Sequence, residues 1–150
     1  KADRAQQSLL DVNVVGDVAV GFLFHGPCGD LRALFALAGL EDVESRLIRR
    51  GGSAASWRVL QGPFEPRDLS LLPARNWTLL VNGVNYRSPR ADDLLQLFSF
   101  IPWARLDDVM VSHAVDGGGV GPHADSYDVF LLQGLGKRRW RLMPPQRRGF

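Results

Sequence analysis

The most informative stretch of this chain is Gly121-Pro-His-Ala-Asp-Ser-Tyr-Asp-Val-Phe-Leu-Leu-Gln-Gly-Leu-Gly-Lys-Arg-Arg-Trp140. Residues 123–133 have the composition of a β-strand, and side chains on a strand alternate between its two faces. His123 and Asp125 should therefore point to the same side, followed on that side by Tyr127. The preceding loop, 116–122, is rich in glycine, which lets a backbone approach a bound group without obstruction by Cβ.

An imidazole and a carboxylate at this spacing can hold one metal ion from a single strand. One more histidine would complete the two-histidine, one-carboxylate set that binds non-haem iron(II) and leaves three positions open. An isolated H-x-D also occurs in proteins without metal, where it is the polar face of a half-exposed strand. Arg138 strengthens the metal hypothesis, because after the tight turn at 134–136 its guanidinium can pair with the carboxylate of a small acid.

The segments around this stretch are predicted from local signals. Asp30 can cap a helix that Gly39 ends, and Ser88-Pro89 is typical of a helix start. Expected helices span 29–39 and 88–102; expected strands span 45–50, 56–61, 77–84, 108–115, 123–133 and 137–143. Strands dominate the second half, which predicts a mainly β fold with flanking helices, a β-sandwich or jelly roll.

Composition limits the class of protein. The 150 residues, 45% hydrophobic and 23% charged, suit one globular domain. The apolar segment 12–24 is interrupted by Asp17 and glycines, so we expect no membrane span and no signal peptide. The single cysteine, Cys28, suits a reducing compartment, and a soluble, cytoplasmic protein is predicted. The net charge of +2 does not by itself indicate nucleic-acid binding.

Several motifs together resemble one family, the JmjC-type ribosomal oxygenases, and in particular the bacterial hydroxylases that modify an arginine of a large-subunit ribosomal protein. The resemblance covers about residues 41–143 and is most specific in its central block. The matching motifs are Asp107-Asp-Val-Met-Val-Ser112, Gly117-Gly-Gly-Val-Gly-Pro-His-Ala-Asp125, Tyr127-Asp-Val-Phe130, Gln133-Gly-Leu-Gly136 and Arg138-Arg-Trp-Arg141, with Glu44-Ser-Arg-Leu47, Gly62-Pro-Phe-Glu65 and Asn76-Trp-Thr-Leu-Leu-Val81 upstream.

The resemblance implies a double-stranded β-helix (cupin) that is incomplete here: residues 41–150 would be the N-terminal part of a JmjC domain, and 1–40 match poorly. It implies Fe(II), with 2-oxoglutarate and O2 as cosubstrates. His123 and Asp125 would be the metal ligands, with no separate catalytic residue. Arg138 and Ser112 would bind cosubstrate, and Tyr127 would line the substrate pocket. The family's second iron-binding histidine would lie beyond residue 150, so we expect a piece of a longer enzyme that is inactive alone.

The implied function is hydroxylation of a protein side chain, an arginine of a large-subunit ribosomal protein, and a homodimer is allowed. Ribosome or RNA contact would use a basic cluster near the end of the sequence: Lys137, Arg138, Arg139, Arg141, Arg147 and Arg148. Three alternatives stay open. The oxygenase could act on another protein or on RNA, the domain could be a catalytically silent cupin-like binding module, or the chain could be a basic RNA-binding protein.

Other conspicuous residues are expected to be structural. His113, on the strand before the glycine loop, is interpreted as a core histidine rather than a ligand. The four tryptophans, Trp57, Trp77, Trp103 and Trp140, are interpreted as core aromatics.

Overall fold

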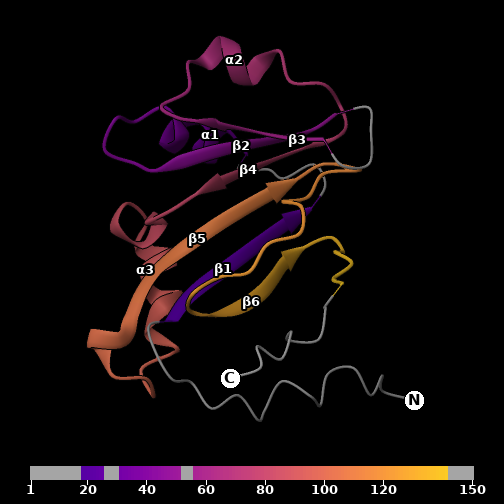
Figure 1. The fold of residues 1–150 in the computed structure, drawn as a ribbon. Coiled ribbons are helices and arrows are strands. Elements are labelled where there is room, and N and C mark those ends of the chain that lie inside the picture. The colour runs from indigo at the N-terminus through magenta and orange to yellow at the C-terminus, as the bar shows by residue number, and fades with distance from the viewer. Residues whose placement is uncertain (1–17, 26–30, 52–55, 142–150) are drawn as a thin grey trace.

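The computed structural model describes residues 18–25, 31–51 and 56–141. Its centre is a six-stranded sheet in the order β3-β2-β4-β5-β1-β6 (Figure 1). The strands are β1 (Val18–His25), β2 (Ser45–Arg50), β3 (Trp57–Gln61), β4 (Trp77–Val81), β5 (Leu106–Ala114) and β6 (Asp128–Leu135). The helices are α1 (Leu31–Ala38), α2 (Pro66–Ser70) and α3 (Pro89–Gln96), with 3-10 turns η2 (Val84–Tyr86) and η3 (Trp103–Arg105). The prediction of a mainly β fold with flanking helices is confirmed.

The half of the sheet formed by β3, β2, β4 and β5 is antiparallel throughout. The two predicted strands 45–50 and 56–61 pair with one another, with Arg50 opposite Trp57. The predicted strand 77–84 ends earlier than expected, at Val81, because Gly83 takes a left-handed conformation with φ of 63°. The predicted helix 88–102 is also shorter: Ser88 and Pro89 start α3 as expected, but its regular part ends at Gln96.

The other half of the sheet contains β1, which local signals did not predict. β1 lies between β5 and β6 and is parallel to both. Through it, Ser112 of β5 and Gln133 of β6 occupy one row, each opposite Leu23. Because β5 and β6 are not neighbours, the chain from 115 to 127, which holds the glycine loop and the H-x-D pair, connects two separated strands.

Two predicted strands differ from the structure. Residues 123–127 are irregular, and β6 begins only at Asp128, where its pairing with β1 starts. Residues 137–141 are irregular as well, and 142–143 lie outside the described residues. A segment becomes a strand only where a neighbour accepts its backbone hydrogen bonds, and neither segment has such a neighbour in the described part of the chain.

The core lies around β4, whose five residues are all buried. α1 packs against β4 and α3 against β5, contributing the buried Leu34, Ala38 and Leu95. Complete burial of one such leucine contributes about 1.5–3 kcal/mol. His113 is 2% exposed, with its ring 5.5 Å from that of Trp77, so its interpretation as a core residue is confirmed.

The prediction that all four tryptophans are core aromatics holds only in part. Trp77 is buried in the core, and its indole N–H donates to the carbonyl of Pro73 at 2.6 Å. Trp103 and Trp140 are 57% and 44% exposed, so for them the prediction is wrong. Trp57 is half-buried on β3 but is not a member of the core cluster.

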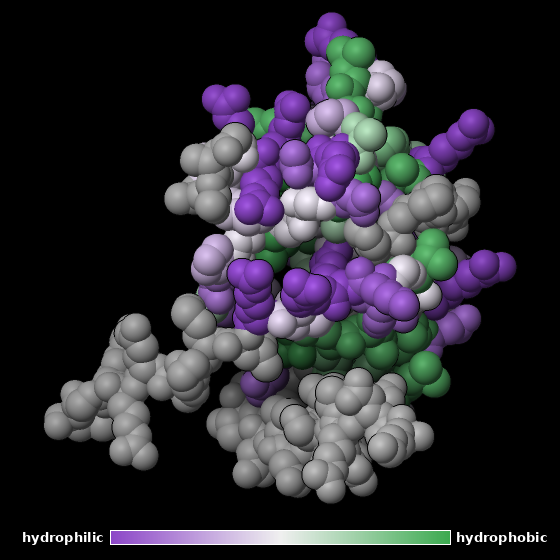
Figure 2. All heavy atoms as spheres, turned by 90° about the vertical axis from the view of Figure 1, so that its right-hand side faces the viewer, coloured by the Kyte–Doolittle hydropathy of each residue, from purple (hydrophilic) through white to green (hydrophobic). Residues whose placement is uncertain are grey.

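The outer strand β6 exposes apolar side chains. β6 is the last strand, and Leu131 and Leu135 on it are 46% and 44% exposed. Figure 2 shows a band of hydrophobic residues low on one face, below a mainly hydrophilic surface. Exposed leucines on an outer strand favour pairing with further strands or with another chain. None of the helices in the described ranges is long and apolar enough to be a membrane span.

Candidate metal and cosubstrate site

The glycine loop is attached to the start of β4. The amide of Asn76 donates to the carbonyl of Asp116 at 2.8 Å, and the amide of Val115 donates to the carbonyl of Trp77 at 3.3 Å. Within the loop, the amide of Gly118 donates to the carbonyl of Val115 at 2.8 Å. These backbone bonds fix the path of the chain just before His123.

His123 and Asp125 come together at the end of this loop. His123 Nε2 lies 3.7 Å from Asp125 Oδ2, and the two side chains are 48% and 43% exposed. His123 Nδ1 lies 3.0 Å from the carbonyl oxygen of Gly121. Because a carbonyl only accepts, this bond requires the proton on Nδ1, and in the neutral ring Nε2 then carries the lone pair on the side of Asp125. Metal-binding histidines use the same arrangement, in which the second ring nitrogen donates to the protein.

The pair fits a divalent metal. Two ligands each about 2.1 Å from one ion lie about 3 to 3.6 Å apart, close to the separation seen here. In the described ranges, no three His, Cys, Asp or Glu residues gather as a metal site.

Arg138 and Ser112 form a second pair. Arg138 Nη1 donates to the hydroxyl of Ser112 at 3.2 Å, across 26 residues of sequence. Ser112 is 1% exposed. Arg138 Nη2 is also buried, and no hydrogen-bond partner for it is found in the described part of the chain. Burial lowers the pKa of Arg138, but an arginine stays charged at neutral pH. A buried cationic nitrogen without a partner is costly, so this position favours an added anion.

Tyr127, predicted to line a substrate pocket, follows the H-x-D pair by two residues and interacts electrostatically with Asp125. Its side chain is 42% exposed. Partial burial raises the pKa of the Tyr127 phenol, and the carboxylate of Asp125 raises it further. The predicted site residues therefore form two described pairs, His123 with Asp125 and Arg138 with Ser112, with Tyr127 beside the first.

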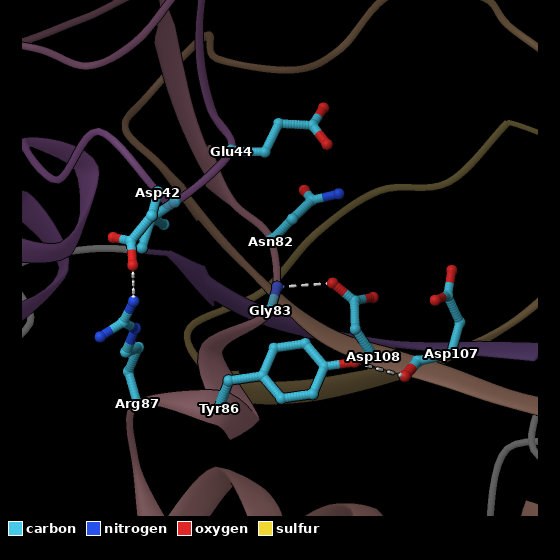
Figure 3. A pocket seen from close by; sticks show the side chains of 9 residues that line it. Asp42, Glu44, Asn82, Gly83, Tyr86, Arg87, Asp107 and Asp108 are labelled. Atoms are coloured by element: carbon cyan, nitrogen blue, oxygen red, sulfur yellow. Dashed lines mark hydrogen bonds and ion pairs between the residues drawn. The ribbon is translucent and has the colours of Figure 1, made fainter.

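The structure also contains a polar pocket of about 340 Å³ (Figure 3). It was not predicted, although the adjacent Asp107 and Asp108 were a visible signal of charge. It contains none of the predicted site residues. Its polar and charged lining residues are Asp42, Glu44, Asn82, Tyr86, Arg87, Asp107 and Asp108. Arg87 pairs with Asp42, so the remaining carboxylates make the pocket acidic.

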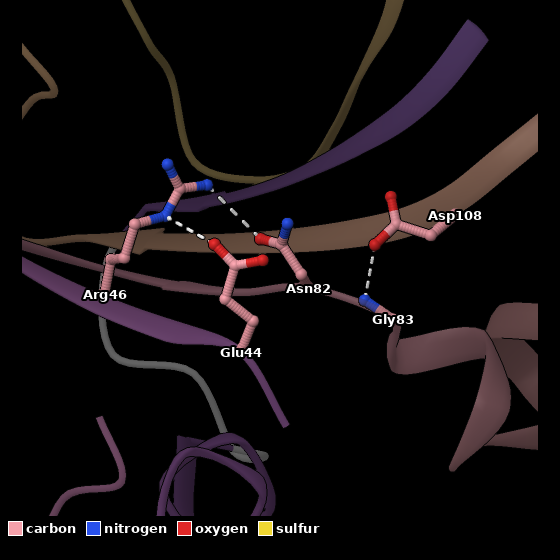
Figure 4. Close-up of polar contacts among 5 residues, drawn as sticks. All are labelled: Glu44, Arg46, Asn82, Gly83 and Asp108. Carbon is pink, nitrogen blue, oxygen red and sulfur yellow. Dashed lines mark hydrogen bonds and ion pairs between the residues drawn. The ribbon is translucent and has the colours of Figure 1, made fainter. Parts of the chain in front are cut away.

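Polar contacts connect the residues that line this pocket with one another and with Arg46 (Figure 4). Arg46 Nε lies 3.7 Å from Glu44, and its Nη2 donates to the side-chain oxygen of Asn82 at 3.4 Å. The carboxylate of Asp108 accepts from the amide of Gly83 at 2.5 Å. Asp108 is 9% exposed, and burial raises its pKa above the ordinary value of 3.8, outweighing the Gly83 amide, which lowers it.

We expect Asp108→Asn to stabilise the fold at neutral pH. Between the ordinary pKa and the raised one, the folded state holds a proton that the unfolded chain has released. The free energy of unfolding therefore falls as the pH rises through that window. Asparagine keeps an acceptor for Gly83 without a buried charge. The melting temperature of the Asp108→Asn variant should exceed that of the unchanged protein at neutral pH. The difference should shrink toward about pH 4, where Asp108 is itself protonated. A gain that grows as the pH falls would contradict this account.

Comparisons with known proteins find similar sequences and similar structures. Residues 93–149 match the family described as JmjC domain. Solved structures of a ribosomal oxygenase are similar to this chain. YcfD, a ribosomal oxygenase from Escherichia coli, superposes with a TM-score of 0.59 at 42% identity, over 64% of this chain and 26% of that one. A second structure of YcfD, in complex with cobalt and 2-oxoglutarate, matches with the same TM-score and identity.

Curated relatives give the same result. The ribosomal protein uL16 3-hydroxylase of Escherichia coli is 47% identical over 109 residues, which are 71% of this chain and 28% of the relative. The probable ribosomal oxygenase of Haemophilus influenzae is 43% identical over 109 residues, 73% of this chain and 26% of the relative. The chain thus spans little more than a quarter of either relative, and the predicted resemblance to JmjC ribosomal oxygenases is confirmed.

Proposed function

We propose that the protein to which these residues belong is an Fe(II)- and 2-oxoglutarate-dependent dioxygenase. Its substrate would be a side chain of a ribosomal protein, an arginine of the large subunit, and it would act in the cytoplasm. Residues 41–150 would form the beginning of its JmjC domain. Similarity to ribosomal oxygenases, one of them solved with cobalt and 2-oxoglutarate, supports the reaction class.

The observation that carries the proposal is the buried Nη2 of Arg138 beside the Ser112 hydroxyl, for which the described residues provide no hydrogen-bond partner. A guanidinium offers a planar set of donors that matches a carboxylate, and burial strengthens such a pair. The distal carboxylate of 2-oxoglutarate would take the place where Nη2 lacks a partner. Ser112 would hold the guanidinium plane in position by accepting from Nη1.

His123 and Asp125 would hold the iron. The Gly121 carbonyl keeps the proton of His123 on Nδ1, so that Nε2 is available as a ligand. Asp125 would supply the carboxylate, and the third protein ligand would come from outside the described residues. When bound, iron and 2-oxoglutarate would supply the chemistry of O2 activation. One oxygen atom of O2 would be inserted into a C–H bond of the substrate, and the other would enter the succinate formed when 2-oxoglutarate loses CO2.

The test uses the whole protein, purified and supplied with Fe(II), 2-oxoglutarate and a large-subunit ribosomal protein. We expect 2-oxoglutarate consumption to rise when the client is added, and the client's mass to rise by one oxygen atom at an arginine. A client with that arginine replaced is the control. Turnover on RNA, or on unrelated proteins only, would contradict the choice of client. Absence of any turnover with metal bound would favour a silent binding module.

Two partner predictions remain predictions. Contact with the ribosome or RNA would use the basic cluster, of which Arg147 and Arg148 lie outside the described residues. A homodimer is likewise untested.

A further inference from the structure

We infer that Trp57, on the outer strand β3, is a positioning residue for the metal ligands His123 and Asp125. The inference rests on the proposed function. Trp57 is far from these residues in sequence, and its indole lies along the glycine loop that leads to them. An ideal Cβ at Gly121 would lie 3.2 Å from Cδ1 and Nε1 of Trp57. A Cβ at Gly119 would lie 3.3 Å from Cη2, at the opposite end of the indole.

The indole therefore spans the loop from Gly119 to Gly121, at a distance that would be tight for a Cβ atom at either position. Gly121 has a φ of 76°, a conformation that other residues adopt only with strain. Contact with the indole restricts the backbone at the residue whose carbonyl oxygen accepts from His123 Nδ1 at 3.0 Å. Trp57 thus acts through Gly121 on the tautomer and direction of the His123 ring.

The surroundings of Trp57 separate this role from ordinary core packing. The other four residues of β3 are exposed, and Trp57 alone on that strand is half-buried. It is absent from the hydrophobic core cluster, whereas Trp77 belongs to it. The guanidinium carbon of Arg50, which is paired with Trp57 across β2 and β3, lies 5.8 Å from its ring centroid. This cation–π contact, together with the loop, fixes the plane of the indole.

The first experiment measures Co(II) affinity of the whole protein without cosubstrate. Partners that orient a metal ligand typically contribute about 10–100-fold to metal affinity. We expect Trp57→Ala to weaken Co(II) binding by about tenfold or more, with Trp57→Phe recovering part of the loss. Trp103→Ala is the matched control, because Trp103 is likewise a tryptophan outside the core cluster and lies in η3, at the other end of β5 from the loop. It should leave the affinity unchanged.

A second measurement needs no metal. Hydrogen exchange at the amides of 117–121 should speed up in Trp57→Ala, while exchange in β4 and β5 stays as in the unchanged protein. A merely structural role for Trp57 would instead raise exchange across the sheet or lower the melting temperature without a local effect. Either of these outcomes, with Co(II) affinity unchanged, would overturn the inference.

Gly119 provides a double-mutant test of the contact itself. Gly119 does not have a positive φ, so Gly119→Ala adds a methyl group against the indole without backbone strain. We expect Gly119→Ala to weaken Co(II) binding in the unchanged protein and to have almost no effect when Trp57 is already alanine. Additive effects would mean that the two residues act independently and would contradict the inference.

His123→Ala distinguishes the two levels of the argument. If it leaves Co(II) affinity unchanged, the proposed metal site is wrong. If it abolishes binding while Trp57→Ala does not affect it, the metal site stands and the role of Trp57 is wrong.

Discussion

His123→Ala in the whole protein is expected to lower metal affinity by more than about 100-fold and to abolish 2-oxoglutarate turnover, since even changes behind a metal ligand cost about 10–100-fold. The reason is the geometry of the pair: His123 Nε2 faces Asp125 at 3.7 Å, with its other nitrogen bound to Gly121. Isothermal titration with Co(II) and a 2-oxoglutarate consumption assay measure both effects.

The fold should survive this change. The His123 side chain is 48% exposed, and substitutions at such positions usually change stability by within about 0.5 kcal/mol. Ser126→Ala, an exposed position between the pair and Tyr127, is the control for local disturbance of the loop. Turnover that persists at the level of the unchanged protein would remove His123 from the metal site.

Arg138→Ala is expected to raise the apparent constant for 2-oxoglutarate by about thirtyfold or more, because loss of one partner of a buried charge pair costs about 2–5 kcal/mol. Two hydrogen-bonding nitrogens are involved: Nη1 is held by Ser112, and Nη2 is buried without a partner in the described residues. Arg138→Lys keeps the charge but not the planar set of donors, so it should recover only part of the affinity.

Arg139→Ala is the matched control. Arg139 follows Arg138 directly and is exposed. Its loss should change the constant by no more than about twofold, the scale of an exposed ion pair. If Arg138→Ala has an effect that small, Arg139 or Lys137 would have to be considered instead. Ser112→Ala should have an intermediate effect, because it frees the guanidinium without removing it.

Local sequence was sufficient for parts of the structure whose signals are contained in neighbouring residues. The Ser88-Pro89 start of α3 and the strands β2 and β3 were predicted because proline at a helix start and the composition of a short strand act over a few residues. The choice of His123 and Asp125 as a pair was likewise local. Their closeness was predicted for a reason that the structure corrects: they lie on an irregular segment, not on one face of a strand.

Tertiary structure decided what depends on partners distant in sequence. Residues 18–25 became β1 because β5 and β6 accept their backbone hydrogen bonds on both sides, and no local pattern states which strands will be neighbours. The same holds for Arg138, which reaches Ser112 without the predicted strand 137–143. The sequence by itself determined the types of side chain available for metal and carboxylate binding. Only the packing of β3 and β4 against the loop decided that Gly119 and Gly121 lie beneath Trp57, because van der Waals contact depends on separation in space and not along the chain.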